Sequence, residues 1–226
     1  MIWSIQMSVV KALSERFSCR KFTPDKLPDE KVHELLISAQ RTASWCNTQP
    51  WSVHIVSGEL LVELSHALVE AAKIGRPPVP DIEFPEKYIG QYKERRKVCG
   101  LQLYKSVGIE RGNAEKTQNQ LLENFRFFGA PHVAFISTPQ ELGTYGAVDC
   151  GLYLSSFMLV AQEMGLATIA QAALASYPDI VRQFVPIEEG RDLLCGISFG
   201  LADVTHPVNS YRTERETIDS IAEFHT

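Results

Sequence analysis

The 226-residue sequence lacks the short motifs that would assign a function directly. It contains neither G-x-G-x-x-G nor G-x-x-x-x-G-K-[ST], so a dinucleotide that binds here does not use a Rossmann turn, and no P-loop is present. H-x-x-x-H, H-E-x-x-H and C-x-x-C are absent too, and these are the spacings typical of zinc sites. We therefore expect no bound metal.

Long apolar runs and an excess of positive charge are also missing. No stretch of about 18 uninterrupted apolar residues occurs, so no membrane-spanning helix is expected. The N-terminal stretch MIWSIQMSVVKALSERF has no continuous apolar region and no small-residue cleavage site, so we expect no signal peptide. A net charge of −5 argues against nucleic acid as a partner. Five cysteines, scattered singly, make a disulfide framework improbable and favour a reducing cytoplasm.

The hydrophobic periodicity predicts a mixture of helices and strands. Apolar spacing favours helices at 8–16, 28–39, 59–73 and 144–165, and Pro178 is expected to open another. Strands are expected at 51–56 and 192–202, a turn and a strand within 129–138, and a short strand and a turn within 166–174. The C-terminal tail is expected to be basic and then helical. Regular βαβ units are too few for a doubly wound sheet. We therefore predict a single α+β domain over residues 1–226.

Two segments predict features beyond a compact core. Residues 76–125 begin with a proline-rich stretch and continue with charged helical patterns at 86–107 and 114–127, which indicates a lid or a partner-facing arm; a plain surface decoration is equally compatible. The helix at 144–165 is apolar on nearly every side, and such a helix must be buried all round. A subunit interface is the economical way to cover it, so a homodimer is expected.

The stretch SWCNTQPW (44–51) raises the question of a cysteine nucleophile. Such a cysteine needs a histidine base and an environment that lowers its pKa. No histidine in the sequence lies in a recognisable motif around Cys46, and no cysteine-hydrolase signature surrounds it. A thiol hydrolase remains a distant alternative, and the simpler interpretation is that Cys46 fits a tight turn.

Two basic clusters at opposite ends of the chain predict a phosphorylated ligand. Arg16, Arg20 and Lys21 surround Ser18 near the N-terminus, and Arg212 and Arg215 follow near the C-terminus. Guanidinium groups bind phosphate through two hydrogen bonds, and hydroxyl groups add neutral donors. Solvated surface arginines are the alternative interpretation of the same pattern.

Five motifs in order resemble the FMN-dependent nitroreductase family. They are ERFSCRKF, ASWCNTQPW, NFRFFGAPHV, GLATIAQAAL and RTERE, spread over most of residues 8–225. SWCNTQPW, NFRFFGAPH and YPD are most similar to the bacterial nitrobenzoate- and nitroaromatic-reducing members. The resemblance implies a mostly antiparallel sheet flanked by helices, in a domain-swapped homodimer that binds two FMN molecules across its interface.

The resemblance also implies the cofactor-binding residues. Arg16, Ser18 and Arg20 would hold the FMN phosphate and ribityl chain, together with Arg215 and, less strongly, Arg212. Ser44 and Asn47 would come from the partner subunit, and Arg126 would lie near the flavin pyrimidine edge. Ala172 and Ala173 would act through their backbone. The complete predicted set is Arg16, Phe17, Ser18, Arg20, Ser44, Trp45, Cys46, Asn47, Arg126, Gln171, Ala172, Ala173, Arg212 and Arg215.

The implied activity is transfer of hydride from NADH or NADPH through FMN to a small aromatic acceptor, such as a nitroaromatic compound or a quinone, in a ping-pong cycle. The flavin carries the chemistry, so no acid–base pair of side chains is expected. Other flavin enzymes of this fold, such as FMN-dependent reductive dehalogenases, are the alternative. Trp45 replaces the small residue that many members have beside the flavin and is expected to form a wall of the pocket.

Overall fold

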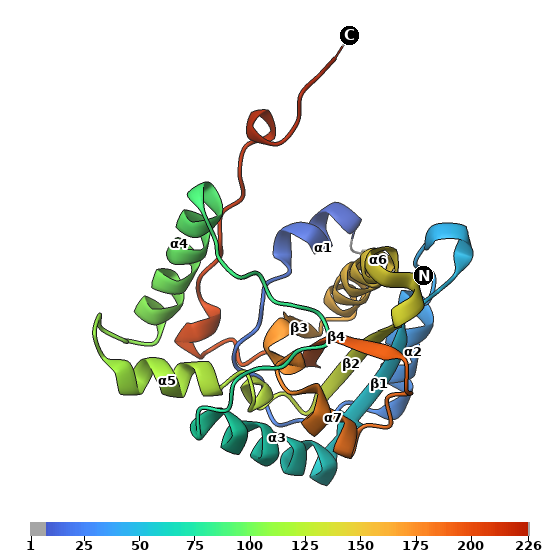
Figure 1. Cartoon of the computed structure of the whole chain (residues 1–226). Helices are drawn as coiled ribbons and strands as arrows, with labels where there is room; N and C mark the ends of the chain where they lie inside the picture. Colours follow the sequence, from blue (N-terminus) through green and yellow to red (C-terminus); the bar gives the residue numbers. More distant parts are fainter. Residues whose placement is uncertain (1–7, 226) are drawn as a thin grey trace, which may run out of the picture.

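A computed structural model describes residues 8–225 of the chain (Figure 1). Residues 1–7 and Thr226 lie outside the described part. The first of these segments begins the stretch for which no signal peptide is expected. The helices are α1 (Val9–Glu15), α2 (Asp29–Ala39), α3 (Gly58–Lys73), α4 (Gly90–Ser106), α5 (Ala114–Leu122), α6 (Gly143–Glu163) and α7 (Pro178–Phe184), and the strands are β1 (Ser52–Ser57), β2 (His132–Pro139), β3 (Ala167–Gln171) and β4 (Arg191–Gly200). The mixture of helices and strands confirms the predicted α+β class.

The four strands form one sheet in the order β1-β2-β4-β3, and every neighbouring pair is antiparallel. β2 pairs with β1 through Val53 opposite Ile136, and β4 pairs with β3 through Ser198 opposite Ile169. The predicted mostly antiparallel sheet is therefore confirmed. Its order places β3 at an edge, where the N-terminal turn can reach it.

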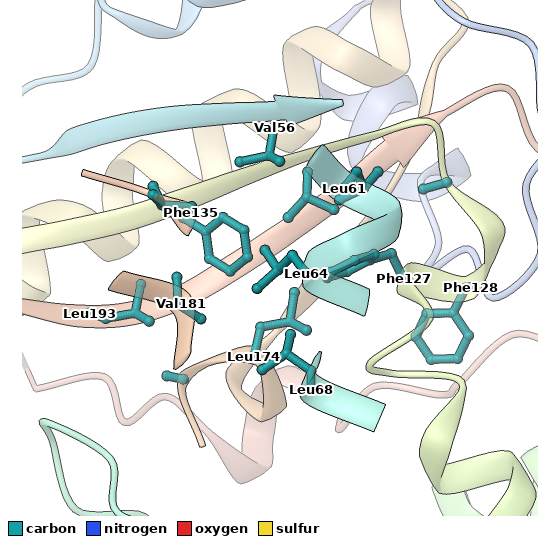
Figure 2. Packing of buried hydrophobic residues seen from close by; sticks show 14 of the residues in the cluster. Val56, Leu61, Leu64, Leu68, Phe127, Phe128, Phe135, Leu174, Val181 and Leu193 are labelled. Atoms are coloured by element: carbon teal, nitrogen blue, oxygen red, sulfur yellow. The ribbon is translucent and has the colours of Figure 1, made fainter. Parts of the chain in front are cut away.

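Helices cover both faces of this sheet, so β2 is buried on both sides. Val133 and Phe135 join the core under α3 and α7, whereas Ala134 and Ile136 join the core under α2 and α6. Figure 2 shows the first of these cores, in which leucines of α3 meet Phe135 of the sheet. This two-sided burial explains why β2 is apolar without alternation from Val133 to Ile136.

Residues 76–125, which we call the arm, lie beside the sheet and do not cover it (Figure 1). α4 has no buried residue, and α5 buries only Leu122. The predicted charged helices are present, although α4 starts at Gly90 and not near residue 86. The arm thus forms a polar wall at one side of the sheet.

The C-terminal tail differs from the prediction, because only a short 3-10 turn at Ile218–Ser220 interrupts an otherwise irregular segment. The tail passes α4, where Arg95 Nε donates to Glu216 Oε1 at 2.8 Å, and then leaves the body of the chain (Figure 1). Ile218, Ile221 and Phe224 remain exposed. A helix as short as the one expected in the tail is not stable in water by itself and needs another surface against which its apolar face can pack.

Among the described residues, no helix is sufficiently long and apolar to cross a membrane. The same residues contain no group of three or more histidine, cysteine or carboxylate side chains placed to hold a metal ion.

Candidate functional site

The N-terminal and C-terminal basic clusters meet around one cavity of about 290 Å3, which we call the arginine cavity. Its wall includes Arg16, Arg20, Arg212 and Arg215, together with hydroxyl groups such as that of Ser18. No carboxylate side chain lines it. The predicted convergence of the two clusters is therefore present in the structure.

The basic turn of residues 16–21 is attached to the sheet edge and to the C-terminal segment. Cys19 N donates to Thr168 O of β3 at 3.0 Å. Asn209 accepts from Arg20 N at 2.8 Å through Oδ1, and its Nδ2 donates to Lys21 O at 2.8 Å. Asn209 is buried, so these bonds are shielded from water. One amide side chain thus links segments that are far apart in the sequence.

The charge of the arginine cavity is unbalanced. Arg16 Nε is buried and has no hydrogen-bond partner in the described part of the chain. Burial, and after it the positive charge of Arg215, lowers the pKa of Arg16. The guanidinium of Arg212 lies over the ring of Phe17, with its carbon 3.9 Å from the ring centroid. An anion bound here would relieve the repulsion and satisfy the buried N–H.

A second cavity of about 240 Å3, the central cavity, shares Arg20 with the arginine cavity. One wall is the end of β3 and the 3-10 helix that follows it, including Gln171, Ala172 and Ala173. Tyr104 of the arm lines the same cavity. The cavity therefore lies between the sheet edge and the arm, directly next to the cationic cluster.

Gln171 acts as a structural link at the floor of the central cavity. Its Nε2 donates to Asn124 O at 3.0 Å, and its Oε1 accepts from Ser198 Oγ. The side chain is buried and both ends are occupied. Contacts from this segment to a ligand thus come from the backbone of Ala172 and Ala173, which are more exposed.

The two cavities fit FMN in chemistry. A phosphate matches the guanidinium groups of the arginine cavity, which have no carboxylate in the wall, and the isoalloxazine ring matches a cavity that combines aromatic and aliphatic walls with backbone and amide groups. Arg20 stands between the two and can reach either part.

The segment SWCNTQPW lies elsewhere in the chain, and its residues line neither cavity. Trp45–Asn47 forms a 3-10 turn in which Cys46 and Asn47 have φ values of 50° and 57°, and Gln49 has a φ of 49°. Residues other than glycine seldom adopt such angles, so the turn is strained. Within one chain, the predicted contributions of Ser44, Trp45, Cys46 and Asn47 are not brought to the site.

Asp149 of α6 holds the strained turn in place. Its buried carboxylate accepts from Trp45 N at 3.1 and 3.2 Å and from Thr48 Oγ1 at 3.4 Å. The exposed Trp45 ring meets the ring of Tyr145 edge to face, with 4.7 Å between centroids. The turn thus presents an aromatic pair to solvent beside the N-terminal end of α6.

Cys46 shows no catalytic pairing. Among the hydrogen bonds of residues 8–225, none involves its thiol. His132 is buried and its Nε2 accepts from Leu27 N at 3.0 Å, whereas His54 Nε2 contacts Ser52 Oγ at 3.2 Å. These two histidines are engaged away from Cys46, and its thiol has no hydrogen-bond partner in the described part of the chain, which disfavours a thiol hydrolase.

Arg126 does not line the arginine cavity or the central cavity. It is half-buried, and its Nη1 donates to Glu123 Oε1 at 2.7 Å. Its neighbour Asn124 lines the central cavity instead. The structure of the single chain thus leaves Arg126 outside both cavities.

Asn209 and Asp149 are two positioning residues that the sequence analysis missed. No local sequence motif surrounds either of them. The only signal was that Asp149 is an acidic residue in an otherwise apolar helix, which indicates a buried partner.

Comparisons with known proteins identify the family. A model of the nitroreductase family matches residues 13–201. The nitroreductase NfnB of Mycolicibacterium smegmatis is 37% identical over 217 residues, covering 95% of this chain and 91% of the relative. The 4-nitrobenzoate reductase of Pseudomonas putida is 30% identical over 212 residues, covering 94% and 93%.

A solved structure shows the same fold. The crystal structure of the FMN-dependent nitroreductase NfnB from Mycobacterium smegmatis, in complex with NADPH, superposes with a TM-score of 0.91 at 36% identity, covering 97% of this chain and 100% of that chain. The family model and these relatives extend over nearly the whole sequence. The chain therefore belongs to the nitroreductase family.

Proposed function

We propose that this chain is an FMN-dependent oxidoreductase that takes electrons from NADPH or NADH and reduces nitroaromatic or quinone-like acceptors. The observation that carries the proposal is the pair of adjoining cavities, one cationic and free of carboxylates, the other lined by Phe128, Ile169 and Ala172. A relative in complex with NADPH and another named for nitrobenzoate reduction support this donor and acceptor chemistry.

The cationic residues act in binding. Arg16, Arg212 and Arg215 neutralise the phosphate of FMN, and Ser18 adds a neutral donor at the same wall. Arg20 lies at the junction of the cavities, where it faces the ribityl chain and the polar edge of the ring. Because these groups come from both ends of the chain, the FMN phosphate contacts the N-terminal and the C-terminal segment at the same time.

The central cavity orients the ring. Phe128 and Ile169 provide apolar surface, and the backbone of Ala172 and Ala173 provides polar groups at one edge. When bound, FMN supplies hydride acceptance from a nicotinamide and delivery of reducing equivalents to an acceptor. The described cavities hold no acid–base pair of side chains, so the protein contributes binding, orientation and exclusion of water.

A homodimer would complete this site. α6 leaves Tyr145, Val148 and Leu152 exposed along one stripe, and α1, which packs against α6, exposes Val9 and Val10. An apolar surface that extends over two neighbouring helices is typical of a subunit interface. The strained turn at Trp45–Asn47 lies at the N-terminal end of the same stripe, so dimerisation can bring it to the cavities of the partner subunit.

The C-terminal tail supports an exchange of segments between the subunits. Ile218, Ile221 and Phe224 are exposed on a segment that runs away from its own chain (Figure 1). We propose that the tail packs on the partner subunit, and that the chain acts as one FMN-binding domain with the arm as a lid. Free cysteines, three of the five buried, suit a reducing cytoplasm.

The visible spectrum of the purified protein tests the proposal. Bound FMN gives absorption near 450 nm, and anaerobic addition of NADPH or NADH should bleach it; 4-nitrobenzoate should then restore it. A protein that remains colourless after incubation with FMN would contradict the proposed function, and a bleached flavin that 4-nitrobenzoate fails to reoxidise would contradict the acceptor class.

A further inference from the structure

A third cavity lies on the other side of Arg20, and we call it the lysine cavity. It has a volume of about 400 Å3 and is bounded by the basic turn, the loop between α4 and α5, α5 itself, and the 3-10 turn Pro207–Asn209. Lys21, Lys116, His206 and Arg20 contribute basic groups to its wall. Asn119 of α5 adds an amide. The cavity is therefore built for an anion.

The charges in the lysine cavity are not compensated by neighbouring acids. In the part of the chain that the structure describes, neither Lys21 nor Lys116 has a carboxylate within 4.0 Å. Glu123 is the one carboxylate in the wall, and Arg126 already pairs with it at 2.7 Å. Asp203 lies close by, but its carboxylate accepts from the backbone N–H groups of Thr205 and His206 and from the Thr205 hydroxyl.

His206 contributes a hydrogen-bond donor to the wall of the lysine cavity. Its Nδ1 accepts from Val208 N at 3.2 Å, so the ring proton is on Nε2. The ring therefore has an Nε2–H group to donate. Together with the lysines and Asn119, it forms a set of donors in the wall, and the carboxylate of Glu123 in the same wall is already paired with Arg126.

The lysine cavity adjoins the central cavity. Arg20 and Gln120 line both. A ligand with one end in the central cavity, beside Ala172, can therefore extend past these two side chains into the lysine cavity. The arginine cavity lies on a different side of Arg20 and already accounts for the single phosphate of FMN.

We propose that the lysine cavity binds the 2′-phosphate of NADPH and makes NADPH the preferred electron donor; this inference rests on the proposed function. The nicotinamide must approach the flavin in the central cavity, so the rest of the dinucleotide leaves from there. NADPH carries a phosphomonoester that NADH lacks, and lysines that have no carboxylate partner are suited to bind such a doubly charged group.

Steady-state kinetics of the FMN-loaded enzyme at fixed ionic strength test the assignment. Lys116→Gln, on the exposed side of α5, should raise the KM for NADPH about tenfold, since a charge-assisted hydrogen bond is lost. The KM for NADH should change less than twofold. Lys116→Arg should keep most of the NADPH affinity, and Lys97→Gln, an arm lysine paired with Glu94, serves as the matched control.

Competition identifies which phosphate is recognised. Adenosine 2′-monophosphate should compete with NADPH, and Lys116→Gln should abolish that competition, whereas adenosine 5′-monophosphate and inorganic phosphate should compete far more weakly. The assignment would be overturned if Lys116→Gln changed both KM values equally or left the KM for NADPH unchanged, or if inorganic phosphate competed as strongly as adenosine 2′-monophosphate. The proposed function would survive these outcomes, provided that the flavin is still reduced. A wild-type protein that oxidises neither nicotinamide would instead overturn the proposed function itself and this assignment with it.

Discussion

Replacing Arg16 with glutamine should change the stability of the FMN-free and FMN-bound protein in opposite directions. In the free chain, Arg16 Nε is buried without a partner, and burial and Arg215 lower the pKa of the guanidinium. Glutamine removes this cation and its repulsion while keeping polar volume. The FMN-free variant should therefore unfold at a temperature equal to or above that of the wild type.

The bound protein should lose stability, because the phosphate loses a charge-assisted hydrogen bond. Such a bond contributes about 1.5–3 kcal/mol, which corresponds to FMN binding weakened roughly 10- to 150-fold. At an FMN concentration of about 100 times the wild-type Kd, the ligand adds about 2.7 kcal/mol of stability; with binding weakened a hundredfold, only about 0.4 kcal/mol remains. For a chain of this length the difference lowers the Tm by about 5–9 °C.

Thermal unfolding followed by circular dichroism, with and without FMN, and a flavin fluorescence titration measure both effects. Arg111→Gln is the matched control, because Arg111 is exposed in the arm and lines neither FMN cavity. Wild-type FMN affinity in Arg16→Gln would refute the assignment of the arginine cavity to the phosphate. A large loss of stability in the FMN-free variant would refute the account of an uncompensated charge.

Three further predictions concern the interface, the thiol and pH. Leu152→Arg, at a position exposed in the single chain, should give a monomer with little FMN by light scattering; an intact FMN-bound dimer would contradict the interface on α6. Cys46→Ser should keep NADPH oxidation within about twofold, and loss of turnover with FMN still bound would revive the nucleophile. Burial, and after it Lys26, lowers the pKa of His132, so its contribution to stability is present above its ordinary pKa of 6.5 and is lost as pH falls through the lowered value. Urea unfolding measures the free energy of unfolding at pH 7.5 and 5.5, and its difference between the two pH values should be smaller in His132→Gln, which retains an acceptor for Leu27 N. A difference equal to that of the wild type would show that His132 does not cause the pH dependence of stability.

The sheet and its covering helices could be predicted because their signals are local. β2 and α6 are long apolar segments bounded by Pro, Gly or polar residues, and periodicity alone identifies such elements. The tail could not be predicted, because Ile218, Ile221 and Phe224 have helical spacing but no surface of their own chain to pack on. Helical spacing therefore reflects a helix only where packing stabilises it.

The residues of the cationic cluster could be predicted from the sequence, but the hydrogen bonds that hold the cluster in place could not. Arg16 and Arg215 are visible in the sequence, and their convergence follows from the resemblance to the family. The bonds that hold the turn, from Arg20 N to Asn209 and from Asn209 to Lys21 O, connect residues almost a whole chain apart. No local pattern encodes such a pairing, and the same holds for the hydrogen bonds between Trp45 N and Asp149.

The link through Asn209 has a consequence for the order in which the protein is made. Ribosomes add residues from the N-terminus, and segments fold as they emerge. Arg16 and Arg20 emerge early, yet the residues that fix their turn and complete the cationic wall emerge last. A nascent chain therefore cannot hold the cofactor phosphate firmly until synthesis is almost finished, so flavin loading is confined to the completed polypeptide.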